Sequence, residues 1–499
     1  MRRDIVISLS LATLWFIGVW SDLLPFLYIS ERFPIGALPC WNDFAAVLLN
    51  VAGLAAIFAV AGTVARRGAP WLRKAAGLAL IASLAVPANA LRMHFRTWPE
   101  VWYEGLGSTA GPLVLGAIGL AGLIVVLRWR EQVVSGVLAV LTIMFPLVLV
   151  TSAQGVWAIA QAGGRMQCGS TTGLADRIAG AATRRVLWVV YDELDFATPF
   201  EKRPEGLRLP NFDQLVAESL SATAAAPPGA STERSMPSFL SGARALDATL
   251  VGRNQLMLHF EGRASRTTWT SADTLLPKVR ALGMNAGIAG FFLPYCALVG
   301  DSVTACSAEP CVTCGRLTGV FGSTFTASLW YQVAELAPRY GPRRHLGAYQ
   351  ATQKSALALA ADPSIGFALL HLPVPHAPTI YDQRRGDFAT GHIAGDGYLQ
   401  NLALADRSLG EIRRAVADAG LSDRTTVIVF GDHGRRDPPG SQQVADPRVP
   451  FIVKLPGESR GVQVHSPLEV IRVHDLTLEV LAGRLHTLDS LVEWLSTRP

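Results

Sequence analysis

Val186-Leu-Trp-Val-Val-Tyr-Asp192-Glu193 is an apolar, β-branched run that ends in two acids, and Thr425-Thr-Val-Ile-Val-Phe-Gly-Asp432-His433-Gly434 repeats this layout. Each run predicts a buried strand of a parallel sheet, with the acid at its carboxyl end. Open α/β sheets bind ligands at the carboxyl ends of their strands. Carboxylate oxygen and imidazole nitrogen suit zinc or manganese, with calcium or magnesium as alternatives. We therefore predict that Asp192, Asp432 and His433 bind one divalent metal ion.

A hydroxyl-rich segment lies between these two strands in sequence. It reads Ala230-Ser-Thr232-Glu-Arg-Ser235-Met-Pro237-Ser-Phe-Leu-Ser-Gly242. A metal ion can activate a hydroxyl for nucleophilic attack, much as it lowers the pKa of bound water. Thr232 and Ser235 are the candidate nucleophiles, and Thr232 can also serve as a helix N-cap. A nucleophile beside a metal site predicts an enzyme.

The hydrophobic residues are concentrated in the first third of the chain. The protein has 499 residues, half of them hydrophobic, and a mean hydropathy of +0.30. Five stretches approach the length that crosses a bilayer: Ile5–Ile29, Phe44–Val64, Ala75–Leu91, Pro112–Leu127 and Val133–Ala160. We predict a transmembrane domain of about five helices over residues 1–160, a linker over 161–184 and an exported domain over 185–499.

Basic residues gather before the first stretch and in alternate loops. They are Arg2, Arg3, Arg66, Arg67, Arg73, Lys74, Arg128 and Arg130. By the positive-inside rule the amino terminus is cytoplasmic, and an odd number of spans exports the carboxyl domain. This predicts a multi-pass protein of a bacterial inner membrane with a periplasmic or extracellular domain. The net charge of +5 partly reflects these arginines, and no basic stripe predicts nucleic-acid binding.

The exported part alternates strand and helix patterns, which predicts an α/β/α sandwich. The predicted strands are Val186–Tyr191, Gly287–Phe292, Phe367–Leu372, Thr425–Phe430 and Val449–Lys454. The predicted helices include Asn211–Ser219, Ala351–Ala361 and Tyr398–Ala419.

Four cysteines cluster in the exported domain: Cys296, Cys306, Cys311 and Cys314, while Cys40 and Cys168 fall on predicted outward-facing segments. In an oxidising compartment such a cluster predicts disulfides. A zinc site at Cys311 and Cys314 is the alternative, although no second ligand pair completes it.

Five motifs in order resemble the alkaline phosphatase superfamily, and specifically its sulfatase-like branch. They are Asp192-Glu193, Pro210-Asn211-Phe-Asp213-Gln-Leu, His371-Leu-Pro-Val-Pro-His376-Ala-Pro, Gly431-Asp432-His433-Gly434 and Val449-Pro-Phe-Ile-Val-Lys-Leu-Pro-Gly457. The resemblance covers residues 185–485. Five predicted membrane spans ahead of such a domain resemble the arrangement of the membrane phosphoethanolamine transferases and lipoteichoic acid synthases.

The resemblance favours Thr232 as the nucleophile, since Ser-Thr-x-x-Ser-x-Pro carries the catalytic threonine of the phosphoethanolamine transferases. Ser235 lies in Ser-Met-Pro-Ser, which resembles the sulfatase Cys-x-Pro-Ser-Arg without its cysteine and arginine. The transferases also place a histidine about a dozen residues after the Asp-His pair. Here that stretch reads Ser441-Gln-Gln-Val-Ala-Asp446-Pro-Arg448, and this departure from the pattern argues against a second metal site and against a precise assignment to the transferases.

The resemblance implies further roles for side chains near the metal. Thr232 becomes a fourth metal ligand, and His376 stabilises or protonates the leaving oxygen. His371, Arg448 and Glu193 are predicted to bind substrate. The alternatives are a structural role for one histidine and a solvated or ion-paired Arg448. For Glu193 they are a ligand role like that of the second acid of sulfatases, or a surface position.

The predicted reaction is transfer or hydrolysis of a phosphate-linked head group on an envelope lipid or membrane-proximal glycan, through a phospho-threonine. One alternative is a sulfuric ester hydrolase, which the missing cysteine disfavours. The other is a catalytically silent envelope protein that binds a glycan or a partner.

Overall fold

A computed structural model describes residues 2–24, 39–94, 110–161, 173–252, 255–310, 324–334, 336, 341–390, 395–436, 444 and 446–497. The chain forms two compact units. The helical unit comprises Met1–Ser30, Pro39–Cys168 and Gly319–Arg339, and the α/β unit comprises Glu31–Leu38, Gly169–Thr318 and Tyr340–Pro499.

The helical unit is built around the long helix α4. Its helices are α1 Arg2–Trp15, α2 Ile17–Leu23, α4 Trp41–Arg67, α5 Pro70–Ser83, α6 Ala85–His94, α8 Ala110–Arg128, α9 Arg130–Ile143, α10 Phe145–Ala160 and α15 Phe325–Ala334. Among the described residues, three stretches are long and apolar enough to cross a membrane: Trp41–Arg67, Pro70–Ala90 and Arg130–Ala160. The spans predicted at Ile5–Ile29 and Pro112–Leu127 stay predictions.

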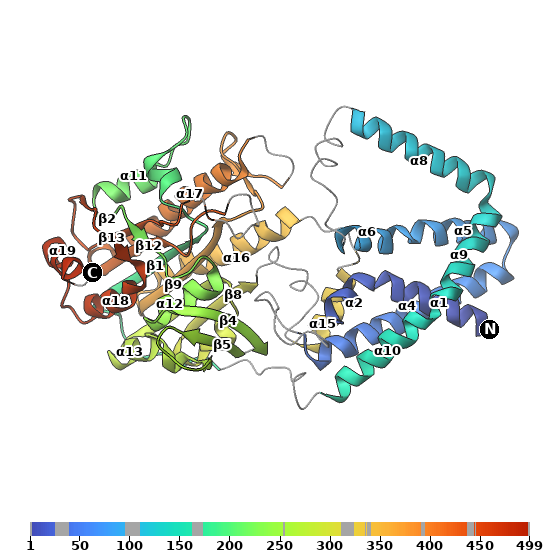
Figure 1. The fold of residues 1–499 in the computed structure, drawn as a ribbon, viewed down its shortest axis with the longest axis horizontal. Coiled ribbons are helices and arrows are strands. Elements are labelled where there is room, and N and C mark those ends of the chain that lie inside the picture. The colour runs from blue at the N-terminus through green and yellow to red at the C-terminus, as the bar shows by residue number, and fades with distance from the viewer. Residues whose placement is uncertain are drawn as a thin grey trace. The chain divides into compact units, whose positions relative to one another are not determined.

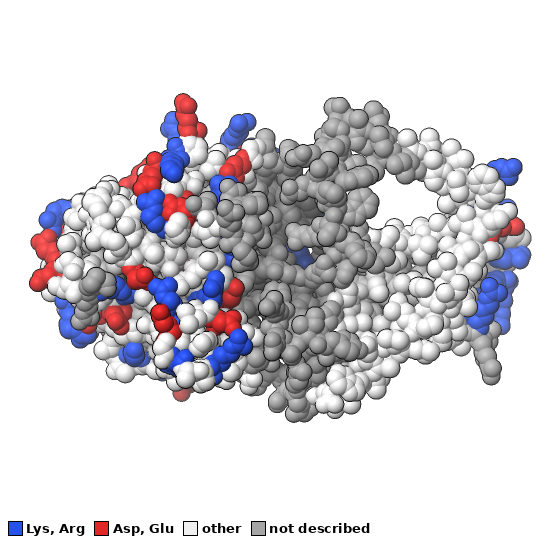
Figure 2. Space-filling model, in the orientation of Figure 1, with Lys and Arg blue, Asp and Glu red and all other residues white. Residues whose placement is uncertain are grey.

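Charged residues of the helical unit gather at one of its ends. The start of α1 and the end of α4 meet there, because Arg66 Nη1 lies 2.7 Å from Asp4 Oδ1. The α4–α5 and α8–α9 turns lie at this same end (Figure 1), and they carry most of its basic residues (Figure 2). On the face that Figure 2 shows, the remaining described surface of these helices is almost free of charge. This distribution is the one expected of a bundle with one polar end and an apolar belt.

An eight-stranded mixed sheet forms the centre of the α/β unit, in the order β14-β2-β13-β12-β1-β9-β7-β8. Its strands are β1 Arg185–Asp192, β2 Leu220–Ala222, β7 Asn285–Phe292, β8 Ala305–Pro310, β9 Ile365–Pro375, β12 Thr425–Gly431, β13 Phe451–Lys454 and β14 Val462–Val464. The five predicted strands are confirmed. One difference is direction, because β13 runs antiparallel to both β12 and β2.

Helices cover both faces of this sheet, as predicted (Figure 1). Alternate residues of β1 reach opposite layers, since Trp188 Nε1 donates to Thr477 of α18 whereas the Tyr191 hydroxyl donates to the Ala405 carbonyl of α17. One layer contains α11 Pro210–Ala217, α16 Gly341–Ala361 and α17 Gly397–Asp418. The other contains α12 Thr232–Ser241, α13 Leu276–Ala281 and α18 Val473–Leu481.

Smaller elements complete the α/β unit. Three antiparallel strands form a second sheet: β4 Ala245–Gly252, β5 Gln255–Phe260 and β6 Thr267–Trp269. The short pairs are β3 Ala225–Ala226 with β15 Leu468–Glu469, and β10 Tyr381–Asp382 with β11 Asp387–Phe388; the remaining helices are α14 Tyr295–Val299 and α19 Leu488–Ser496.

Disulfide-bonded cysteines are found in both units, as predicted. Cys296 of α14 is bonded to Cys306 of β8, and Cys40 is disulfide-bonded as well. Cys168, Cys311 and Cys314 lie outside the described residues, so the alternative zinc site is untested.

Candidate metal centre

Two neighbouring parallel strands, β1 and β12, bring Asp192, Asp432 and His433 together, and a third, β9, adds His371. β1 lies between β12 and β9, with Tyr191 opposite Gly431 and Val190 opposite His371. The carboxyl ends of β1 and β12 therefore lie side by side at one edge of the sheet. Asp192 is the last residue of β1, and Asp432 directly follows β12. This is the sheet edge at which open α/β sheets bind their ligands.

Asp192, Asp432 and His433 offer ligand atoms that all lie within 4.8 Å of one another. His433 Nε2 is 3.6 Å from Asp192 Oδ1 and 3.7 Å from Asp432 Oδ2, and all three side chains are buried. Asp192 Oδ1 has no hydrogen-bond partner in the described part of the chain. Two buried carboxylates and an imidazole around one point form a donor set that fits a divalent cation.

Electrostatics agrees with this fit. Burial, then the charges of Asp432 and Glu193, raise the pKa of Asp192 well above its ordinary value. Burial opposes the charge of Asp432 too, but His433, His371 and the Thr232 hydrogen bond hold the pKa of that carboxyl below its ordinary value. Two such acids repel each other when both are charged, and a cation between them removes this repulsion.

Thr232 points its hydroxyl toward the candidate metal ligands. It is the first residue of α12, capped by Ser231, and its Oγ1 donates to Asp432 Oδ2 over 2.6 Å. The N-cap role predicted as an alternative for Thr232 therefore falls to Ser231. The rival nucleophile Ser235 donates its hydroxyl to the Gly229 carbonyl at 3.0 Å. The structure places Thr232, and not Ser235, against the acids.

Replacing Ser235 with alanine is expected to change turnover by less than about threefold, since its hydroxyl bonds to backbone and not to the acids. Metal content should be unchanged. Turnover and metal stoichiometry of the purified full-length variant measure both effects. A loss as large as that of a Thr232 variant would move the nucleophile to Ser235.

At the two glycines of the Gly431-Asp-His-Gly434 motif, the backbone lies close to a carbonyl oxygen of another segment. A Cβ on Gly431 would lie 2.3 Å from the Leu194 carbonyl oxygen, and one on Gly434 would lie 2.2 Å from that of Asp446. Larger residues there would displace the acid and the histidine between them. The motif is thus explained by steric demands as well as by its ligands.

Glu193 is buried, which excludes the alternative that it is a surface residue. Its backbone has φ +67°, a strained region for a residue other than glycine, and its amide donates to Asp432 Oδ1 at 3.0 Å. Its Oε1 lies 3.9 Å from His376 Nε2 and 3.8 Å from Arg436 Nε. Glu193 therefore orients Asp432 through its backbone, and its carboxylate faces the His376 ring and the Arg436 guanidinium.

His371 is held from the opposite side by a tyrosine. The hydroxyl of Tyr295 lies 3.0 Å from His371 Nδ1, while Nε2 lies 4.0 Å from Asp432 Oδ2 and has no hydrogen-bond partner among the described residues. Burial lowers the pKa of His371 to about 4, so the ring is neutral at neutral pH. Burial, with the charges of Asp432 and Asp192, raises the pKa of Tyr295 well above its ordinary value, so its hydroxyl can donate to Nδ1. Nε2 can then carry the ring proton toward the site.

Replacing Tyr295 with phenylalanine is expected to lower turnover about tenfold, because a buried Nδ1 loses its partner and the ring loses its orientation. Metal content should stay unchanged. Tyr349→Phe is the control, since it removes a buried phenol hydroxyl from α16. Equal turnover in the two variants would show that Tyr295 does not position His371.

Two further residues join the site that the sequence did not reveal. Arg436 follows the Asp-His pair, is mostly buried, and donates through Nη2 to the Ala230 carbonyl at 3.4 Å as well as facing Glu193. His345 of α16 is fully buried, with its ring centroid 6.3 Å from that of His376. A lone arginine and a lone histidine carry no spacing signal, so no pattern could have found them.

Arg448 lies in a different network. Its guanidinium pairs with Glu201 Oε2 at 2.6 Å and with Asp446 Oδ2 at 2.7 Å, and its Nη1 also donates to the Thr223 carbonyl. These contacts match the ion-paired alternative for Arg448. The arginine beside Glu193 is instead Arg436, which also contacts Ala230, two residues before Thr232.

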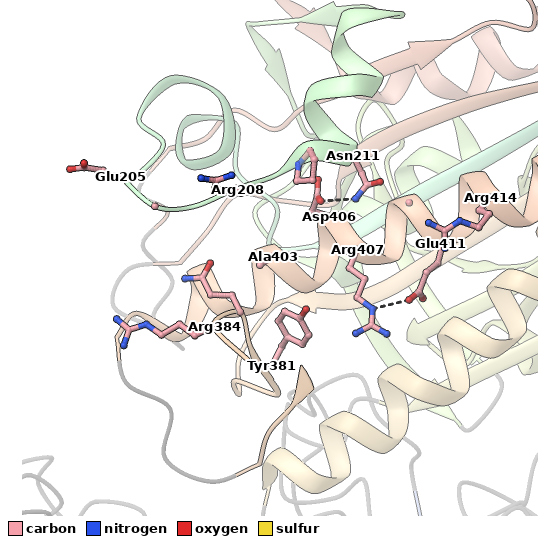
Figure 3. A pocket seen from close by; sticks show the side chains of 14 residues that line it. Glu205, Arg208, Asn211, Tyr381, Arg384, Ala403, Asp406, Arg407, Glu411 and Arg414 are labelled. Carbon is pink, nitrogen blue, oxygen red and sulfur yellow. Dashed lines mark hydrogen bonds and ion pairs between the residues drawn. The ribbon is translucent and has the colours of Figure 1, made fainter. Parts of the chain in front are cut away.

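A separate hollow of about 760 Å³ opens beside α17 and the segment before α11 (Figure 3). Its lining includes Arg208, Arg384 and Arg414, and Arg407 within it pairs with Glu411 at 2.8 Å. None of the metal-centre residues lines this hollow, so we assign it no part in the reaction.

No protein-family model matches the chain, and no curated protein sequence does. Solved structures similar to it include a phosphonate monoester hydrolase of Agrobacterium radiobacter, at 14% identity and TM-score 0.39 over 60% of this chain and 74% of that one. A sulfatase from Pseudoalteromonas sp., PsFucS1, has 15% identity and TM-score 0.42 over 61% and 69%. An alkaline phosphatase superfamily protein from Vibrio parahaemolyticus has 13% and 0.40 over 63% and 70%. Values this low do not establish a family, so the proposals that follow rest on this chain's own side chains.

Proposed function

We propose that the protein is a membrane-anchored, divalent-metal-dependent hydrolase or transferase of the sulfatase-like kind. It acts on a phosphate-linked head group of an envelope lipid or membrane-proximal glycan. The single observation that carries this proposal is the Thr232 hydroxyl, 2.6 Å from Asp432 Oδ2 in the buried cluster with Asp192 and His433. A hydroxyl in that position is ready to become a nucleophile.

Asp192, Asp432, His433 and Thr232 would hold the cation, which when bound would stabilise negative charge on oxygen. The Thr232 proton leaves toward Asp432 Oδ2, its hydrogen-bond acceptor. A bond forms between Thr232 Oγ1 and phosphorus as the bond from phosphorus to the leaving oxygen breaks. Water or an acceptor alcohol then takes the phosphoryl group and restores the hydroxyl.

Three further side chains serve the substrate in this proposal. His376 is partly exposed and therefore reachable, so it protonates or stabilises the leaving oxygen. His371 donates a hydrogen bond from Nε2, and Arg436 attracts the anionic substrate. Glu193 keeps His376 and Arg436 in place.

A lipid or membrane-proximal substrate is favoured by the three stretches able to span a membrane. A protein fixed in a bilayer meets its substrate at that surface. We propose that the anchor is a bacterial inner membrane with the α/β unit on the periplasmic or extracellular side, as the basic residues at one end of the helical unit favour.

A sulfuric ester hydrolase fits the same cation site equally well. The observation against it is the missing cysteine, because the motif that resembles the sulfatase Cys-x-Pro-Ser-Arg has Ser235 in its place and the candidate nucleophile is Thr232. A catalytically silent binding protein is the third candidate. It is disfavoured because a buried pair of acids is costly to keep without a cation or a reaction.

The test uses the full chain in detergent or bilayers with added Zn²⁺ or Mn²⁺. Phosphatidylethanolamine and phosphatidylglycerol labelled in the head group, an aryl phosphodiester and an aryl sulfate are offered in parallel. Label transferred to glycolipid or glycan identifies a transferase, and free labelled head group identifies a hydrolase. Turnover of the aryl sulfate alone would overturn the phosphoryl proposal in favour of the sulfatase. Absence of both turnover and bound metal would leave the silent protein.

A further inference from the structure

The helix α15 has its polar and apolar faces arranged in the opposite way to a helix in water. Ser328 and Gln332 lie one turn apart on the face toward α4, and both are fully buried. On the other side Trp330 is 69% exposed, Tyr331 43% and Val333 42%. A water-facing helix buries its apolar stripe and exposes its polar one.

The buried polar face is fully used in contacts with α4. The Ser328 hydroxyl donates to Asp43 Oδ1 at 2.6 Å, and Gln332 Nε2 donates to the Asp43 carbonyl at 2.9 Å. Asn50, two turns further along α4, donates to Gln332 Oε1 at 3.1 Å and to the Leu329 carbonyl at 3.2 Å. Polar side chains between helices, with apolar ones outside, are the arrangement found in membranes.

The position along α4 defines the depth of this contact. With 27 residues α4 is about 40 Å long, and Asp43 and Asn50 lie in its first three turns, at the opposite end from Arg66 and Arg67. The ten-residue α15 is about 15 Å long, too short to cross a bilayer core of about 30 Å. It can therefore reach only one leaflet.

We propose that α15 is a lipid-embedded helix, with the leaflet far from Arg66 and Arg67 covering Trp330, Tyr331 and Val333. Trp and Tyr are the side chains enriched at the membrane interface. The exposed apolar residues of α4 itself, such as Leu49 at 53% and Val60 at 64%, give the same unit a lipid-facing surface. The chain thus returns to the membrane from within its carboxyl-terminal half. This inference rests on the membrane anchoring proposed above and not on the catalytic proposal.

The experiment places a photoreactive benzoylphenylalanine at single positions of the full chain in bilayers of phosphatidylethanolamine and phosphatidylglycerol with tagged acyl chains. Trp330 and Val333 test α15, and Val60 tests the membrane anchoring. Leu282 is the control, because it is 43% exposed and lies in the α/β unit. All four replaced side chains are exposed, so the fold is expected to persist. Lipid adducts at 330 and 333 should exceed those at 282 about tenfold, since the proposal places these two side chains within the lipid leaflet.

The outcomes separate the two proposals. Adducts at 60 with none above the Leu282 background at 330 and 333 would overturn the inference about α15 and leave the membrane anchoring intact. Background labelling at 60, 330 and 333 alike would overturn both.

Discussion

Replacing Thr232 with alanine is expected to lower turnover by about 10³-fold or more, because no other hydroxyl in the described part of the site points at the acids. Metal binding should weaken only moderately, since Asp192, Asp432 and His433 remain. The measurement is steady-state turnover of whichever ester the protein cleaves, together with metal content and thermal unfolding.

Thr232→Ser keeps the hydroxyl and should recover a substantial part of the activity, without the methyl group that fixes the rotamer. Ser231→Ala is the control, because it removes the hydroxyl of the adjacent N-cap residue, which accepts from Arg234 Nε at 3.2 Å. A phosphorylated Thr232 trapped by acid quenching and found by mass spectrometry would show the intermediate directly. Alanine variants at 232 and 231 with equal activity would refute the covalent mechanism.

The sheet edge that holds the candidate site could be predicted because two of its strands have a recognisable sequence pattern. In β1 and β12 a fully buried apolar run ends at an acid, and both strands run in the same direction beside each other. The run of apolar residues followed by an acid therefore predicted that Asp192 and Asp432 lie at the carboxyl ends of neighbouring strands. The antiparallel direction of β13 could not be predicted, since a strand of four residues, three of them buried, has no sequence pattern that indicates its direction.

Other parts of the site depend on contacts that local sequence does not encode. Tyr295 and His371 are 76 positions apart in sequence. They meet because β7, which precedes Tyr295, lies beside β9, which contains His371. His345 and Arg436 arrive as single residues on α16 and after β12. The packing of α15 against α4 could not be predicted from the sequence either. Its ten residues are too few for a span pattern, and its polar residues read as those of an ordinary surface helix.

Replacing Asp432 with asparagine is expected to abolish metal binding at concentrations that saturate the wild type, and to lower turnover by about 10³-fold or more. Asp432 is the acid that meets every other part of the centre. It lies 3.7 Å from His433 Nε2, accepts from Thr232, and accepts from the Glu193 amide. The amide of asparagine keeps the shape but removes the charge that a cation requires.

Unfolding gives a second readout that does not need a substrate. For the wild type, metal at about 1,000 times its Kd should add about 4 kcal/mol to the free energy of unfolding, and a chelator should remove that gain. Asp432→Asn should show no such gain. Asp406→Asn is the matched control, because Asp406 is a buried acid that accepts from Asn211 Nδ2 and the Phe212 amide, away from the metal ligands. It should lose stability yet keep both the metal-dependent gain and the bound ion. If Asp432→Asn bound metal as tightly as Asp406→Asn, the cation would have to be held elsewhere, and Thr232 would have no activating partner.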